Sequence, residues 1–370
     1  MSLPREAFTM GVEEEYQIID PESRQLRSRA QSILRKAQAT LGDQVTQELY
    51  LSQIEIGTSV CETIQQVRDE LRHLRGQVIA AARSADSRIV AAGTHPFSHW
   101  QDQKLTPKER YIDLQTDFQQ LTREQLIFGC HVHIGIPDRE LVIDVMNRSR
   151  PWLPVLLALA SNSPFWLGTD TGYASFRTEL WGRWPTAGIP HVFNSRADYD
   201  RLIDDMARTG SITDATKIYW DMRPSSHYET LEFRVTDVCL TVDEAVMIAG
   251  LARALVRTCA LEAEQNSVVV HVRPEILQAA KWQAARYGLA QSLIDPRGGC
   301  AIAAPELIDS FLTYIRPALE EYGDWSEIDQ LVKRVVKEGT GSARQRSEYD
   351  RCGNYEAVVD YMVSESAKGT

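Results

Sequence analysis

The 370-residue sequence lacks any apolar run that approaches the roughly 18 residues needed to span a bilayer. Its first ten residues also lack the basic start and apolar stretch of a secretion signal. The six cysteines occur singly, without a CxxC pair, which argues against a structural zinc site and a disulfide framework. Basic residues are outnumbered, with 40 Lys and Arg against 51 Asp and Glu and a net charge of −11, which argues against a nucleic-acid-binding protein. These absences predict a cytoplasmic protein that binds neither membranes nor nucleic acid.

Glycine-rich phosphate motifs are also missing. There is no GxxxxGK[ST] motif and no GxGxxG motif after a predicted strand, so a nucleotide site cannot be inferred from a glycine-rich loop. The sequence contains no internal repeat and no Pro/Gly/Ser-rich linker that would mark a domain boundary. Although the length alone favours two domains, we therefore predict a single domain over residues 1–370.

Apolar periodicity predicts strands mixed with helices in the first two thirds of the chain and helices in the last third. The predicted strands are Thr9–Ile19, Leu49–Thr58, Arg88–Thr94, Ile127–Ile136, Lys217–Arg223 and Thr230–Val238. The predicted helices are 63–84, stretches within 138–161, 197–209, 242–264, 274–287, 305–322, 326–337 and 355–364. This order predicts an α+β fold in which one antiparallel or mixed sheet is backed by helices, with residues 242–370 in the same domain.

Four of the predicted strands carry two polar residues at positions i and i+2, and such residues share one face of a strand. The pairs are Glu13 and Glu15, Gln53 and Glu55, His131 and His133, and Glu232 and Arg234. The opposite faces are mainly apolar, although Glu14 falls on one of them. For a single strand, a sheet with its polar side in water explains the pattern equally well. The four pairs together contain no Lys, Ser or Thr, so we favour a sheet face lined with metal ligands.

The chemistry of these residues indicates which metal they would bind. Several carboxylates on one face repel one another unless cations neutralise them. Carboxylates and imidazoles without thiolates suit Mg²⁺ or Mn²⁺ better than zinc. Carboxylate-bound Mg²⁺ most often bridges phosphates, and Arg234 could stabilise the charge on a transferred phosphoryl group. A salt bridge between Arg234 and an acid on the same face is an equally good interpretation.

Several longer motifs occur along the chain. They are GVEEEY at 11–16, SQIEIGT at 52–58, GTHP at 93–96, HVHIG at 131–135, NRSRPWLPVLLALASNSPFW at 147–166, DTGYASFRTELWGRWPTAG at 170–188, YWDMRP at 219–224 and TLEFRV at 230–235. Taken together, they resemble the carboxylate–amine ligases of the glutamate–cysteine ligase type 2 family, within the glutamine synthetase-like superfamily. The resemblance runs from about Met10 to GTGSARQR at 339–346 and covers nearly the whole chain.

The resemblance implies a fold and an activity. The implied fold is a curved, mainly antiparallel sheet whose concave face forms the active site, with helices packed on the outer face. The implied reaction joins the γ-carboxylate of glutamate to an amine such as cysteine while ATP is converted to ADP and phosphate. The carboxylate first takes the γ-phosphoryl group to give an acyl phosphate, and the amine then displaces phosphate.

The resemblance also implies roles for the paired residues. In the superfamily, the ExE of the first strand, the first His of HxH and the Glu of ExR bind divalent metals. Carried over by motif, the metal ligands are Glu13, Glu15, His131 and Glu232, with Glu55 as a further ligand. His133 corresponds to a position near the nucleotide phosphates, and Arg234 corresponds to the arginine that contacts the transferred phosphate.

Other arginines are further candidates for the site. Arg177, which we also count as catalytic, Arg183 and Arg223 suit the binding of substrate carboxylates because arginine makes bidentate contacts. Stacking of the loop arginines Arg177 and Arg183 on nearby aromatic rings is an equally good interpretation. Arg344 and Arg346 could reach the ATP phosphates, but an exposed helix start explains them slightly better.

The leading hypothesis is an ATP- and Mg²⁺- or Mn²⁺-dependent ligase, with glutamate and cysteine as the first substrates to test. The same fold acting on another acid or amine, a non-catalytic metal-binding regulatory protein and a two-metal hydrolase are the alternatives. All the expected metal carboxylates and His131 are present, which disfavours the regulatory protein. A homodimer is the default expectation for a soluble enzyme.

Overall fold

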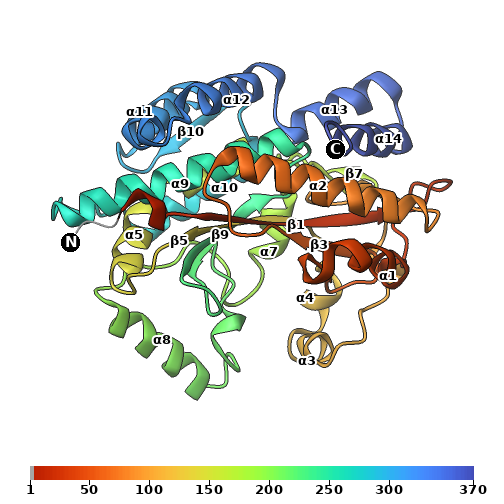
Figure 1. Ribbon diagram of the computed structural model, residues 1–370, viewed down its shortest axis with the longest axis horizontal. Helices are drawn as coiled ribbons and strands as arrows, with labels where there is room; N and C mark the ends of the chain where they lie inside the picture. The colour runs from red at the N-terminus through yellow and green to blue at the C-terminus, as the bar shows by residue number, and fades with distance from the viewer. Residues whose placement is uncertain (1–3) are drawn as a thin grey trace.

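The strand β1 (Met10–Ile19) lies at the centre of the fold, which a computed structural model describes for residues 4–370 (Figure 1). It pairs with three other strands, and every pairing in the seven-stranded sheet is antiparallel. The sheet order is β2-β3-β1-β5-β9-β8, with β4 also paired to β1. The other strands of this sheet are β2 (Val45–Gln47), β3 (Gln53–Gly57), β4 (Arg88–Val90), β5 (Gly129–Gly135), β8 (Met222–Pro224) and β9 (Thr230–Asp237).

Helices and two small hairpins surround this sheet. The helices are α1 (Ala30–Leu41), α2 (Ile64–Arg83), α3 (Glu109–Phe118), α4 (Gln120–Arg123), α5 (Leu141–Ser149), α6 (Leu153–Leu159), α7 (Phe176–Trp181), α8 (Arg196–Arg208), α9 (Val242–Glu264), α10 (Pro274–Tyr287), α11 (Ala304–Tyr322), α12 (Trp325–Glu338), α13 (Gly341–Cys352) and α14 (Tyr355–Ser366). The hairpins are β6 (Phe165–Trp166) with β7 (Thr169–Asp170), and β10 (Ser292–Asp295) with β11 (Cys300–Ala303). The predicted α+β fold with an antiparallel sheet and helices is confirmed.

One face of the sheet is apolar and lies under α2 and α9, above which α11 and α12 form a further layer (Figure 1). Val12, Ile56, Val132 and Phe233 are buried on this face. Their burial follows from strand alternation, since every second residue of these strands is apolar. Both long helices begin with a capping box, in which the side chain of a threonine and that of the third helical residue satisfy each other's backbone N–H groups. The helices therefore begin where their sequences predict.

Some elements were not predicted from the sequence. The polar helix α13 lacks a clear apolar stripe, and the hairpin β10–β11 lies between the predicted helices 274–287 and 305–322, where no strand was predicted. The strand predicted at Lys217–Arg223 is wrong for most of its length, because residues 215–217 form a 3₁₀ turn and only Met222–Pro224 pairs with β9. The single domain stays a prediction. Among residues 4–370, no helix combines the length and the apolar character that a membrane crossing requires.

A buried ion pair joins the apolar face of β1 to α2. The Arg75 guanidinium donates hydrogen bonds from Nε and Nη2 to the Glu14 carboxylate, over 2.8 and 2.5 Å. It also donates to the main-chain carbonyls of Cys239 (2.8 Å) and Leu240 (3.1 Å), in the segment that leads from β9 to α9. Glu14 and Arg75 are 0% and 2% exposed, so each charge depends on the other for compensation. This pair connects the central strand to both long helices.

We predict that Arg75→Met lowers the free energy of unfolding by about 3–5 kcal/mol, because it leaves the Glu14 carboxylate buried without a counter-charge. Urea denaturation measures the loss. Arg72→Met, on the exposed side of the same helix, is the matched control and should change stability by no more than about 0.5 kcal/mol. An equal loss in the two variants would contradict the role of the pair.

Candidate active site

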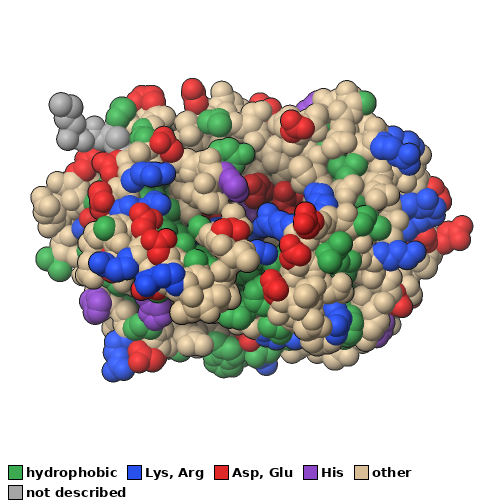
Figure 2. Space-filling model, turned by 90° about the horizontal axis from the view of Figure 1, so that it is seen from below, with side chains coloured by type: hydrophobic (Ala, Val, Ile, Leu, Met, Phe, Trp, Pro, Cys, Tyr) green, Lys and Arg blue, Asp and Glu red, His purple; other side chains and the backbone are tan. Residues whose placement is uncertain are grey.

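The second face of the sheet lines a cleft of about 1100 Å³. It lies opposite α2 and α9, and acidic, basic and histidine side chains gather around a hollow in the middle of this side of the molecule (Figure 2). All four polar pairs predicted from the sequence contribute residues to the lining. The concave shape and the mixture of polar and aromatic walls are those of a small-molecule site.

The antiparallel register places the polar residues of neighbouring strands directly opposite one another. Glu15 of β1 faces Glu55 of β3, and Glu13 of β1 faces His131 of β5. His133 of β5 in turn faces Glu232 of β9. A row of carboxylates and imidazoles therefore crosses four strands, because directly opposed residues in antiparallel strands hold their side chains close together.

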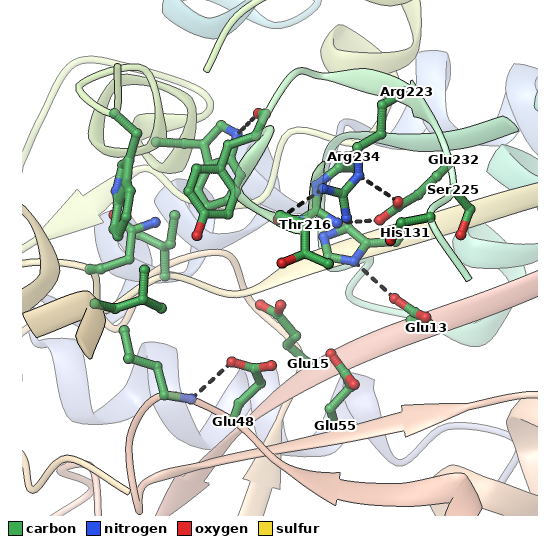
Figure 3. A pocket seen from close by; sticks show the side chains of 18 of the residues that line it. Glu13, Glu15, Glu48, Glu55, His131, Thr216, Arg223, Ser225, Glu232 and Arg234 are labelled. Atoms are coloured by element: carbon green, nitrogen blue, oxygen red, sulfur yellow. Dashed lines mark hydrogen bonds and ion pairs between the residues drawn. The ribbon is translucent and has the colours of Figure 1, made fainter. Parts of the chain in front are cut away.

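Three carboxylates form one end of the cleft. Glu15, Glu48 and Glu55 point into a common space, with Glu48 coming from the segment after β2 (Figure 3). Burial, followed by repulsion from Glu48, raises the pKa of Glu15 to about 7. Burial and repulsion from Glu13, Glu48 and Glu15 raise the pKa of Glu55 well above its usual value. The charges of Arg177 and Arg234 act on Glu15 in the opposite direction, but they do not offset burial and repulsion at this end of the cleft.

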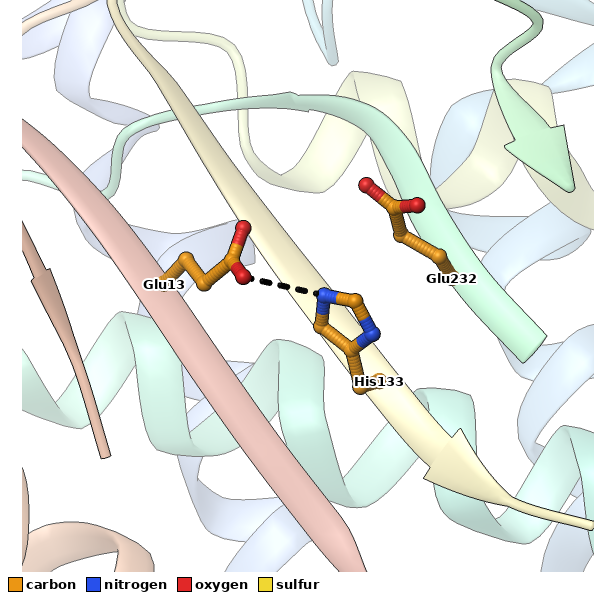
Figure 4. A group of neighbouring side chains, drawn as sticks. All are labelled: Glu13, His133 and Glu232. Atoms are coloured by element: carbon orange, nitrogen blue, oxygen red, sulfur yellow. Dashed lines mark ion pairs between the residues drawn. The ribbon is translucent and has the colours of Figure 1, made fainter. Parts of the chain in front are cut away.

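Glu13, His133 and Glu232 form a second group, from three adjacent strands (Figure 4). Their ligand atoms lie within 4.8 Å of one another. His133 Nε2 is buried, lies 3.3 Å from Glu13 Oε1 and makes no hydrogen bond to a described residue. Burial acts to raise the pKa of Glu13, but the close approach of His131 and His133 outweighs burial and holds that pKa well below its usual value. Oxygen and imidazole atoms with an unsatisfied nitrogen suit a divalent cation.

Arginines occupy the opposite end of the cleft. Arg223 Nε donates to Glu232 Oε2 over 2.8 Å, and Arg234 forms an ion pair with the other oxygen of the same carboxylate. Arg177, on α7, donates from Nη2 to the Arg234 carbonyl over 3.3 Å, and both guanidinium groups lie over the Trp181 ring. The sequence left a salt bridge or a phosphate contact open for Arg234, and the structure has the salt bridge. Glu232 thus orients the guanidinium groups of Arg223 and Arg234 toward the cleft.

The structure does not bring all predicted site residues together. Arg183 lies outside the cleft lining and pairs with Glu124 over 2.5 Å. Arg344 and Arg346 belong to α13, on the helical side of the sheet (Figure 1), and pair with Glu244 and Asp170 respectively. The expectation that these three side chains reach the cleft is therefore not met, because each is held elsewhere by a carboxylate. Arg344 and Arg346 lie at the start of a helix, as the alternative interpretation has it, but their side chains are half-buried and paired rather than exposed.

Two charged residues of the cleft were missed. Glu48 follows a three-residue strand that was not predicted, and Arg110 belongs to α3, whose short apolar spacing was overlooked. Tyr111 and Leu114 of α3 are buried, so a weak helical signal was present in the sequence. Sequence spacing could not show that α3 lies beside Glu48, whose carboxylate accepts a hydrogen bond from the Tyr111 hydroxyl over 3.4 Å.

Sequence comparison relates the chain to one family. The model of "Glutamate-cysteine ligase family 2" matches residues 9–361. A relative from Rhodopirellula baltica is 43% identical over 97% of this chain and 96% of its own length, and one from Herpetosiphon aurantiacus is 41% identical over 99% and 95%. Both carry the provisional name glutamate–cysteine ligase 2.

Solved structures share the fold at low sequence identity. A glutamate–cysteine ligase from Francisella tularensis, in complex with AMP, has a TM-score of 0.74 at 14% identity and covers 98% of this chain and 89% of its own. A bifunctional glutathione synthetase from Pasteurella multocida has a TM-score of 0.73 at 14% identity, over 97% of this chain and 52% of its own. These likenesses show that nearly the whole chain adopts this fold.

We predict that Glu55→Gln stabilises the protein in a metal-chelating buffer, by about 1 kcal/mol or more near pH 8. The pKa of the Glu55 carboxyl is raised in the folded protein, whereas in the unfolded chain this group ionises near pH 4.3. The wild type therefore loses stability as the pH rises above that value. The neutral amide avoids this loss, and its advantage should shrink toward about pH 5. Urea denaturation at both pH values measures the difference. Glu356→Gln, at an exposed position of α14, should show no such trend, and a destabilised Glu55→Gln near pH 8 would refute the prediction.

Proposed function

Because the chain belongs to the glutamate–cysteine ligase family 2, we propose that it is an ATP-dependent carbon–nitrogen ligase that joins the γ-carboxylate of glutamate to the amino group of cysteine. The observation that carries this proposal is the row of opposed carboxylates and histidines that ends at an arginine pair. Such a row offers cation sites at one end and positive charge at the other. Phosphoryl transfer from ATP needs both, since it depends on positioning and charge neutralisation.

The residues of the cleft fit divalent metals. Glu13, His133 and Glu232 would hold one cation, supported by the close approach of their ligand atoms and by the unsatisfied His133 nitrogen. Glu15 and Glu55, joined by Glu48, would hold another, because their mutual repulsion favours a bound cation. His131, predicted as a ligand, contacts Glu13 from 3.1 Å and would orient that carboxylate. Bound Mg²⁺ or Mn²⁺ would neutralise the triphosphate and align it with the substrate.

The arginines would act on the reacting groups. Arg234 and Arg223, held by Glu232, would bind oxygens of the γ-phosphoryl group and stabilise its charge during transfer to the glutamate carboxylate. Arg177 would bind a substrate carboxylate and hold it for attack on the γ-phosphorus. The carboxylate oxygen bonds to phosphorus as ADP leaves, and the amine then replaces phosphate at the acyl carbon and loses a proton. The aromatic wall, including Trp181 and Tyr219, would exclude water that otherwise hydrolyses the acyl phosphate.

The metal and phosphate residues do not select the amine, so another amino acid or amine in place of cysteine stays open. The homodimer and the cytoplasmic location also stay predictions.

We predict that the purified protein releases ADP only when glutamate, an amine and Mg²⁺ or Mn²⁺ are all present. Coupled ADP release over a matrix of acids and amines measures this activity and identifies the amine. Glu15→Gln and Glu232→Gln should lower kcat/KM by about a hundredfold or more, because each removes a charge that would position metal or arginine. Glu356→Gln serves as the unaffected control, and wild-type rates in the two cleft variants would exclude the proposed site.

We predict that Mn²⁺ raises the Tm of the metal-free protein, because a cation that binds only the folded state stabilises it by mass action. Glu13→Gln removes one proposed ligand and should reduce this shift, measured by differential scanning fluorimetry. The same shift in Glu13→Gln and wild type would place the cation elsewhere, whatever the outcome of the activity assay.

A further inference from the structure

A second pocket lies behind the cleft, on the other side of α7. We call it the rear pocket; it has a volume of about 1130 Å³ and is lined by residues that include Arg150, Glu179, Ile189, Leu277 and Trp282. Helix α7 separates the two sites: its Arg177 and Trp181 line the cleft, whereas its Thr178 and Glu179 line the rear pocket. The two linings share no residue among those described.

The Arg150 guanidinium is the first unusual feature of the rear pocket. Arg150 is 3% exposed, and its Nε donates to the Pro190 carbonyl over 2.5 Å. Within residues 4–370, no carboxylate forms an ion pair with Arg150, and its two Nη atoms make no hydrogen bond. Burial lowers the pKa of Arg150 to about 10, which still leaves it charged at neutral pH. A buried charge without a counter-ion is costly, so this guanidinium is suited to an anionic ligand.

The lysine and the other arginine of the pocket are already paired. Lys281 Nζ lies 2.6 Å from the buried carboxylate of Asp221, and Arg183 pairs with Glu124. Arg150 is therefore the cation whose charge is left for a ligand.

Glu179 supplies a charge of the opposite sign. Its half-buried carboxyl group makes no hydrogen bond or ion pair with any residue in the described part of the chain. Burial raises its pKa, whereas the charge of Lys281 acts in the other direction. The pocket thus holds one unpaired cation and one unpaired acid that do not satisfy each other.

Part of the remaining wall is apolar. Ile189, Leu277 and Trp282 line this part, and Trp282 is 45% exposed. A ligand that satisfied both charges and kept an aliphatic or aromatic group on this wall would bury apolar area in addition.

We propose that the rear pocket binds a free apolar α-amino acid, with its carboxylate on Arg150, its ammonium group on Glu179 and its side chain against Leu277 and Trp282. This site is separate from the cleft and requires neither ATP nor a metal. Since α7 carries Arg177 on its other side, occupancy of the rear pocket would act on the position of a proposed substrate-binding residue.

Isothermal titration calorimetry tests the proposal by measuring the binding of L-leucine, L-methionine and L-phenylalanine to the metal-free protein. We expect at least one to bind at micromolar to millimolar concentration. Arg150→Gln should weaken that binding by about tenfold or more, because a hydrogen-bonded charge contact is lost. Glu179→Gln, at a half-buried position that tolerates an amide, should weaken the binding of the amino acid. It should not weaken the binding of the analogue that lacks the amino group. Arg35→Gln, on the exposed side of α1, is the matched control and should bind as wild type does.

The cleft variant Glu232→Gln separates this proposal from the proposed ligase function, and it should keep the amino-acid binding. Absence of binding by all three amino acids would overturn the proposal, as would binding that is lost in Glu232→Gln but kept in Glu179→Gln. Because binding is measured without ATP, an inactive ligase would leave the result interpretable.

Discussion

The arrangement of the molecule depends on where one strand places three consecutive carboxylates. Strand alternation turns Glu13 and Glu15 toward the cleft and Glu14 toward the helices. The Glu14 carboxylate is neutralised by Arg75. Arg75 also donates to a main-chain carbonyl just before α9, and so connects the central strand to both long helices. The two carboxylates on the cleft side have no such dedicated arginine. Glu13 is paired instead with the two histidines of β5, and Glu15 keeps a raised pKa, so both carboxylates face the cleft without an arginine of their own.

The cleft extends this division of charge across the sheet. Antiparallel register brings Glu55 opposite Glu15 and Glu232 opposite His133, so neighbouring strands concentrate ligand atoms. At the far end, Glu232 is shared by two arginines and stops being a source of repulsion. Unpaired carboxylates therefore lie on β1 and β3, and arginines paired with Glu232 lie on β8 and β9, at the other side of the same sheet. A polyphosphate with bound cations and an acidic substrate would match that distribution of charge.

The elements predicted best were those with a strong local signal. The limits of α9 and α10 were predicted to the residue, because a capping box precedes one and a proline begins the other. Helix α13 was missed because its sequence is polar throughout, and its position depends on ion pairs with distant residues such as Glu244. The same long-range pairs hold Arg344 and Arg346 away from the cleft, although the sequence made them candidates for binding the ATP phosphates. The local sequence around an arginine in a polar segment does not predict which distant carboxylate will pair with it.

The sequence by itself determined which residues share a face, because the period of a strand is two and needs no tertiary information. It therefore determined which carboxylates share the cleft face, the α+β class and, through the motifs, the family. Only the tertiary structure decided which faces meet: that Glu48 joins Glu15 and Glu55, that α3 brings Arg110 to the cleft, and that a short helix separates it from a second pocket. These contacts join residues far apart in the chain, and their geometry depends on packing between elements that local patterns do not encode.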